Sequence, residues 1–152
     1  MIPRLNQEHL DYYLERANAL QPGTPRQWGR MDAHRMLVHL NFVLELSLGE
    51  HEVKAMVPRI LRPVFRKVLF VWFINWPKGK IKAPDMFTPA PESTFEEERE
   101  KHIALLKRFA AEEQAQPQRE TSHPIFGQTP LADWTLYHAV HFRHHFLQFG
   151  LI

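Results

Sequence analysis

The chain of 152 residues contains no cysteine. Disulfide bonds, thiolate metal ligands and a thiol nucleophile are therefore excluded, and a soft-metal site would have to use imidazole and carboxylate groups. The first residues, Met1 to Glu8, contain no apolar run, so no signal peptide is expected. The composition is compatible with a reducing cytoplasm, and we expect a cytoplasmic protein with one domain over residues 1–152.

Acidic residues are missing between Val53 and Pro84, where the charged residues are all basic: Lys54, Arg59, Arg62, Arg66, Lys67, Lys78, Lys80 and Lys82. Acids dominate between Glu92 and Glu113 instead. Opposite charge blocks in one small domain usually face each other or solvent. We therefore favour a basic helix packed beside an acidic one over an anion-binding surface.

Long hydrophobic runs are also missing. The most apolar stretch, Val68–Trp76, is far shorter than the ~20 residues that a membrane-spanning helix needs, so no transmembrane segment is predicted. A homodimer contact or a wide core face explains this stretch better than a membrane-surface helix does. No known DNA-reading motif is present, and we predict no nucleic-acid partner.

Strand signals are weak, whereas helix start and stop signals divide the chain into five predicted helices. They run from Asn6 to about Leu20, from Asp32 to Gly49, from Pro58 to Trp76, from a capping box of Ser93 and Glu96 to about residue 115, and from Pro130 to Phe149. Two proline-rich connections, 77–91 and 116–129, join them. The predicted fold class is all-α, a helical bundle.

Four of the ten histidines lie within eight residues of the last predicted helix. His141 and His145 are one turn apart on one face, and His138 and Gln148 belong to the same stripe. Two imidazoles at i and i+4 can direct their nitrogens at one cation, as in other helical metal sites. This spacing is the main reason to predict a metal site.

A catalytic metal site usually needs a third protein ligand, and His39 is the best candidate. It lies within the apolar rhythm of the second predicted helix and should point inward, whereas His34, about 140° around that helix, should lie at the rim. A single histidine on an apolar face is more often a core residue than a ligand. Neutral histidines packed without partners would cost about 1–3 kcal/mol for each unsatisfied group, which favours metal binding by the three together.

These residues resemble the DinB-like superfamily of metal-binding helical bundles, which has one histidine on the second helix and a late His-x-x-x-His-x-x-Gln motif. The matching residues are His39 and the segment His141-Phe142-Arg143-His144-His145-Phe146-Leu147-Gln148. The chain is more similar still to a branch labelled only as a domain of unknown function, through Trp28-Gly29-Arg30-Met31, Pro77-Lys78-Gly79-Lys80 and His123-Pro124-Ile125-Phe126-Gly127. Phe146 and Leu147 stand where the core family often has Arg-Gly.

The resemblance implies an up-down four-helix bundle with an additional helix. It also implies a divalent ion, zinc or nickel, bound by His39, His141 and His145 with water completing its coordination. Known relatives include thiol S-transferases, a thiol-dependent isomerase and amidase-like hydrolases, so a small-molecule thiol is an implied partner. Gln148 would orient a metal ligand, and His138 would be a neighbour of the ligands.

Three interpretations of the function remain open. The first is a metal-dependent enzyme in which His144, about 60° from the stripe of His141 and His145, serves as a proton acceptor or is only a surface residue. The second is a metal-stabilised bundle without catalysis, acting as a binding or oligomeric module. The third is an interaction protein that uses the basic, aromatic helix 59–76 on an anionic surface or another subunit. An open coordination position would favour the first over the second.

Overall fold

The computed structural model describes residues 3–67, 76, 78–79 and 87–152. The protein is mostly helical, as the sequence predicts, and it also contains a small two-stranded sheet. Its helices are α1 (Leu10–Ala19), α2 (Ala33–Leu48), α3 (Arg62–Lys67), α4 (Phe95–Ala115) and α5 (Leu131–Gln148). Short 3-10 turns, η1 (Gln7–His9) and η2 (Arg59–Leu61), precede α1 and α3, and the strands are β1 (Glu120–His123) and β2 (Gly127–Pro130).

The signals at the ends of α2 are the ones that the sequence indicates. The Asp32 side chain accepts a hydrogen bond from the Arg35 backbone N–H, which satisfies one of the free donors in the first turn. Gly49 follows the last turn with φ of 84°, a left-handed conformation that glycine adopts without strain. α2 therefore begins and ends where it is predicted to.

The capping box of α4 is displaced by one residue from its predicted place. Thr94, not Ser93, caps the helix, and its partner is Glu97, not Glu96. The Ser93 hydroxyl instead donates to Glu98 Oε1 at 2.6 Å. Both pairs have the spacing of a capping box, so the sequence motif alone does not distinguish them.

The all-α prediction holds only approximately, because two short strands form in and beside the connection 116–129. β1 and β2 pair as an antiparallel hairpin in which Glu120 lies opposite Pro130 and His123 opposite Gly127. Four-residue strands are too short to give a clear alternating pattern. The hairpin is held against α2, because Thr121 Oγ1 donates to the carbonyl oxygen of Ser47 at 3.0 Å.

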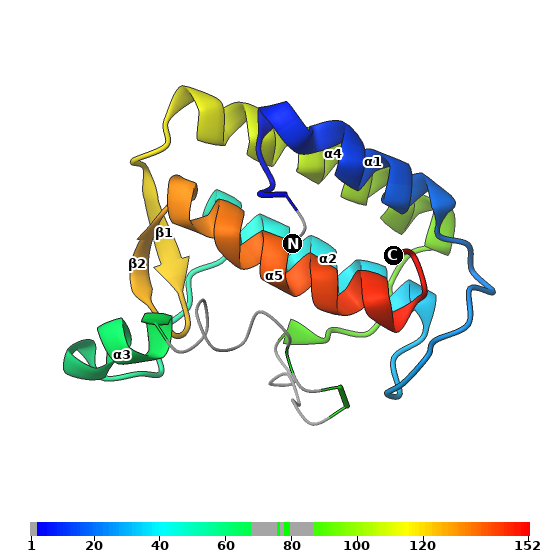
Figure 1. Cartoon of the computed structure of the whole chain (residues 1–152), viewed down its shortest axis with the longest axis horizontal. Helices are drawn as coiled ribbons and strands as arrows, with labels where there is room; N and C mark the ends of the chain where they lie inside the picture. The colour runs from blue at the N-terminus through cyan, green and yellow to red at the C-terminus, as the bar shows by residue number, and fades with distance from the viewer. Residues whose placement is uncertain (1–2, 68–75, 77, 80–86) are drawn as a thin grey trace.

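The predicted third helix is described only at its beginning, in η2 and α3, and residues 68–75 lie outside the described residues. Within the described part, the acidic helix α4 packs mainly on α1 and α2 and also contacts α5. α3 lies beside the hairpin, away from α4 (Figure 1). The predicted pairing of a basic helix with the acidic one is therefore not present in these residues.

The core lies between α1, α2, α4 and α5. Figure 1 shows α1 beside α4 along one side of the molecule and α2 beside α5 along the other. The largest fully buried side chains come from all four helices, among them Tyr13, Leu44, Phe109 and Trp134. Among the described helices, none combines the length and apolarity needed to cross a membrane.

Candidate metal centre

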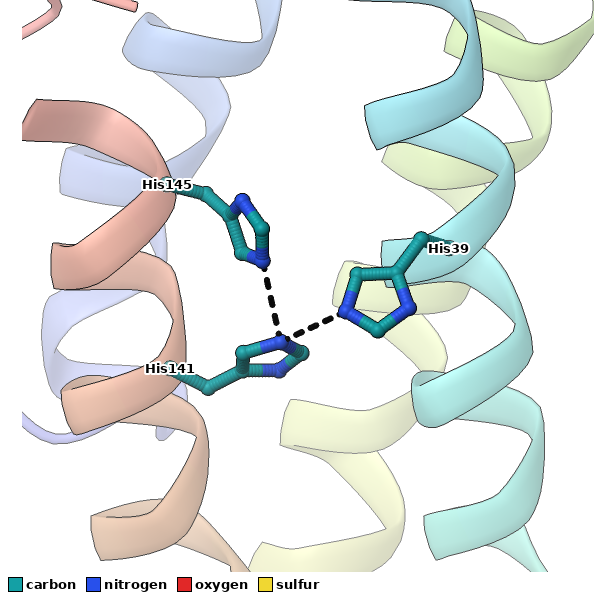
Figure 2. Close-up of side chains that lie close together, drawn as sticks. All are labelled: His39, His141 and His145. Atoms are coloured by element: carbon teal, nitrogen blue, oxygen red, sulfur yellow. Dashed lines mark hydrogen bonds between the residues drawn. The ribbon is translucent and has the colours of Figure 1, made fainter. Parts of the chain in front are cut away.

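Three histidines from two helices meet in the core between α2 and α5. His39 comes from α2, and His141 and His145 come from successive turns of α5 (Figure 2). His39 Nε2 lies 2.8 Å from His141 Nε2, and His145 Nε2 lies 3.2 Å from the same atom. The three side chains are 5%, 2% and 6% exposed, in chain order. One potential ligand atom of each lies within 4.8 Å of the others, so this cluster could hold a metal ion.

The proton of the His39 ring is fixed by a backbone carbonyl. His39 Nδ1 lies 2.6 Å from the carbonyl oxygen of Phe87. A carbonyl oxygen can only accept, so Nδ1 carries the hydrogen and, in the neutral ring, Nε2 presents its lone pair to the cluster. A backbone acceptor of this kind is what usually orients a metal-binding histidine.

The proton of the His145 ring is fixed by Gln148. Gln148 Nε2 donates to the carbonyl oxygen of Trp28 at 3.1 Å, which turns Gln148 Oε1 toward His145 Nδ1 at 2.8 Å. His145 Nδ1 must therefore donate, and its Nε2 is also a bare acceptor. The segment beside Trp28 is held by the end of α5 as well, because the Gln27 backbone N–H donates to the carbonyl oxygen of Gln148 at 2.7 Å.

His141 cannot satisfy both neighbours with one proton. If His141 Nε2 carries the hydrogen, it can donate to Nε2 of His39 or to Nε2 of His145. The Nε2 atom that does not receive this hydrogen bond then has no donor in the cluster. If Nδ1 carries the hydrogen, three lone pairs converge. In either tautomer His141 Nδ1 is buried without a hydrogen-bond partner among the described residues. A cation that accepts three lone pairs removes this conflict.

Protonation of the cluster is the other way to resolve the conflict, and burial opposes it. Desolvation is the largest cause that lowers the pKa of His39, and it lowers the pKa values of His141 and His145 well below the usual imidazole value. Mutual repulsion between the rings lowers them further. The three imidazoles are therefore neutral near pH 7, which is the protonation state that binds metals.

His144 lies beside the cluster at its half-buried edge. Its ring centroid is 5.2 Å from that of His145 and 5.7 Å from the nearest ring centroid of Trp76. Burial lowers the pKa of His144, while a hydrogen bond to the backbone of Trp76 raises it, which identifies the ring as the donor. Trp76 also lies over His141, with centroids 5.5 Å apart. His144 thus holds an aromatic side chain against the cluster.

His138 lies one turn before His141 and is completely buried. Its Nε2 lies 3.0 Å from Ser47 Oγ, and the Ser47 hydroxyl already donates to the carbonyl oxygen of Leu44, so His138 Nε2 is the donor. Burial lowers the pKa of His138 to about 3. Its hydrogen bond connects α5 to α2 rather than to the ligand cluster. His34 is half-buried, and its ring packs edge-on against Phe95 instead of joining the cluster.

Sequence reasoning missed the two carbonyl groups, of Phe87 and Trp28, that fix His39 and His145. It also missed a buried polar network between α2 and α4. Asn41 Nδ2 donates to Glu98 Oε2 at 2.7 Å, and Asn41 Oδ1 accepts from His102 Nδ1 at 2.7 Å. Asn41 interrupts the apolar face of α2, and that interruption is the one sequence signal for the network.

The fold and the site together define a mostly helical protein with a buried cluster of three neutral imidazoles that could hold a divalent ion. The chain belongs to the family described as protein of unknown function (DUF1569), whose family model matches residues 2–150. Comparison with curated proteins and comparison with solved structures both find no match.

Proposed function

We propose that this protein is a divalent-metal-binding member of the DinB-like superfamily, in which α1, α2, α4 and α5 form the up-down four-helix bundle and α3 is additional. His39, His141 and His145 would hold the ion, zinc or nickel, through Nε2 of each ring. The observation that carries the proposal is the excess of acceptors at the cluster. Hydrogen bonds outside the cluster fix bare Nε2 atoms on His39 and His145, and His141 can donate to only one of them.

The donor set fits such an ion, because imidazole nitrogen is a common ligand for zinc and nickel and three protein ligands are typical of catalytic sites. A metal ion bound there supplies Lewis-acid chemistry that makes a thiol or water nucleophilic near neutral pH. The proposed activity is accordingly a metal-dependent thiol S-transfer or hydrolysis. Gln148 and the Phe87 carbonyl would keep the ligand rings oriented throughout.

His144 is the proposed proton acceptor. One nitrogen of its neutral ring donates to the backbone of Trp76, so the other nitrogen has a free lone pair. Its half-buried position beside His145 would let it take a proton from a small molecule that approaches the cluster. Trp28 and Trp76 contact the His144 ring and would exclude water from that side.

A metal-stabilised bundle without catalysis is the second candidate. It is favoured by the near-complete burial of the three rings, since a structural ion needs no access for a substrate. The two candidates differ in the number of metal ligands that the protein supplies. X-ray absorption spectroscopy of the zinc-loaded protein distinguishes three imidazole nitrogens plus an exchangeable ligand from a closed shell of four protein ligands.

Metal content tests the proposal directly. The untagged protein is loaded with zinc, dialysed, and measured by elemental analysis, together with His39→Ala, His141→Ala and His34→Ala. We expect one ion per chain in the wild type and in His34→Ala, and none in the other two variants. Equal metal content in all four proteins would contradict the proposal. A screen of small thiols as cosubstrates follows only if metal binds.

A further inference from the structure

Exposed apolar side chains are concentrated in one short segment. Met56, Ile60, Leu61 and Val64 are 66%, 85%, 45% and 59% exposed, and the only other large hydrophobic residue exposed in the described part is Ile152 at the chain end. We call residues 56–64 the apolar patch. Such clustering marks a surface that contacts another phase or another molecule, because single exposed apolar residues are normally scattered.

The patch is attached to the hairpin by its backbone. The Met56 backbone N–H donates to the carbonyl oxygen of Pro124 at 2.6 Å. Arg62 Nε donates to the carbonyl oxygen of Val57 at 3.0 Å, and its guanidinium lies so close to Gly127 that a Cβ there would collide with it. Figure 1 shows α3 extending from this end of the molecule beyond the hairpin. The patch is therefore presented outward by a fixed support.

The charge of the residues beside the patch indicates which kind of partner the patch fits. No acidic residue occurs among the described residues 53–67, and Lys54 and Arg59, next to the exposed apolar residues in the sequence, are themselves exposed. A second copy joined by a two-fold axis would bring two patches of the same positive charge together, which is unfavourable. A nucleic acid would neutralise the charge but leave Ile60 and Val64 in water. An anionic surface with an apolar layer directly beneath its charges would pair with the basic side chains and also cover the exposed apolar ones.

We propose that the apolar patch binds the surface of a bilayer that contains anionic phospholipids. Ile60, Leu61 and Val64 would enter the boundary between headgroups and acyl chains, and Lys54 and Arg59 would contact the lipid phosphates. The protein is then peripheral, attached by one short segment. This inference is independent of the metal centre.

Sedimentation with vesicles tests it. The intact protein is mixed with vesicles of phosphatidylcholine alone or with about one-third phosphatidylglycerol, which supplies an anionic surface potential. We expect binding only to the anionic vesicles, and its loss at about 1 M salt, where the Debye length falls to about 3 Å. Equal binding to both compositions, or no binding to either, would overturn the proposal.

Variants separate the two contributions. Lys54→Gln with Arg59→Gln should weaken binding about 25-fold, from roughly fivefold for each basic residue near an anionic surface. Ile60→Ser with Val64→Ser should weaken it about tenfold or more. Lys107→Gln and Ile152→Ser, which alter an exposed basic and an exposed apolar residue elsewhere, should leave it unchanged.

Folding and competing partners are controlled in the same samples. Lys54 and the three substituted residues of the patch are all exposed, so melting temperature and metal content should match the wild type. Analytical ultracentrifugation should give a monomer at all concentrations. A concentration-dependent dimer that the Ile60→Ser and Val64→Ser variant abolishes would show that the patch pairs with a second copy instead, and it would overturn the lipid proposal. Weakening of vesicle binding by the two control variants to the same extent would overturn it too.

Discussion

Gln148 should control metal affinity without touching the metal. Its Oε1 is the acceptor for His145 Nδ1–H, at 2.8 Å, and its Nε2 donates to the carbonyl oxygen of Trp28. Substitution Gln148→Met keeps a similar volume but removes both hydrogen bonds. His145 then loses the partner that fixes its tautomer and ring orientation.

The expected loss follows from the role of such partners. Removing the group that orients a metal-binding histidine typically weakens metal affinity 10- to 100-fold, or about 1.4–2.7 kcal/mol. Gln148→Glu should behave differently, because a carboxylate still accepts from His145 Nδ1–H while its contact with the Trp28 carbonyl is lost. We expect Gln148→Glu to bind zinc within a few-fold of the wild type. In the absence of metal, Gln148→Met should lose about 2 kcal/mol of folding stability, from two hydrogen bonds, and Gln148→Glu about 1 kcal/mol, from the hydrogen bond to Trp28.

The assay is competition for zinc against a chromogenic chelator at pH 7, with apo stability measured by urea unfolding. Gln128→Met, at an exposed position on the hairpin, is the matched control and should leave the zinc Kd unchanged. The reasoning is refuted if Gln148→Met binds zinc as tightly as the wild type. It is also refuted if Gln148→Glu loses as much affinity as Gln148→Met, since the effect would then come from the Trp28 contact.

Two further predictions concern stability. Burial lowers the pKa values of His102, His123 and His138 to about 3, below the unfolded value near 6.5, so their stabilising effect is complete above pH 6.5 and is lost as the pH falls toward 3. Each of the three histidines should lower the free energy of unfolding by about 2 kcal/mol between pH 7 and pH 5. Equal free energies of urea unfolding at the two pH values would contradict this prediction. Thr94→Ala should lower stability by about 1 kcal/mol through loss of the capping box, whereas Ser93→Ala should leave the α4 cap intact in the same thermal measurements.

The sequence predicted the helices with strong end signals better than the connections between them. Asp32 and Gly49 bound α2, and Pro130 and Gly150 bound α5, because these residues satisfy or stop a helix through their own chemistry. Once both helices were assigned, the i, i+4 spacing of His141 and His145 and the apolar neighbours of His39 were enough to nominate the three side chains. The convergence of their Nε2 atoms is a property of tertiary packing.

The partners of these histidines had no comparable signal. The carbonyl groups of Phe87 and Trp28 orient His39 and His145. Because every residue has a carbonyl group, the residue types at these positions do not predict this role. The hairpin was missed for a different reason, because pairing of two four-residue strands depends on the tight turn between them rather than on a long alternating pattern.

The buried network at Asn41 helps to position His39 in the cluster. Asn41 and His39 are two residues apart on α2 and so point to nearly opposite sides of the helix. Asn41 bonds Glu98 and His102 on α4, while His39 faces His141 on α5. The polar contacts fix the rotation of α2 between its two neighbours, and a rotation that broke the Asn41 bonds would also turn His39 away from α5. Asn41→Leu should therefore disturb the geometry of a metal centre whose ligands it does not contact.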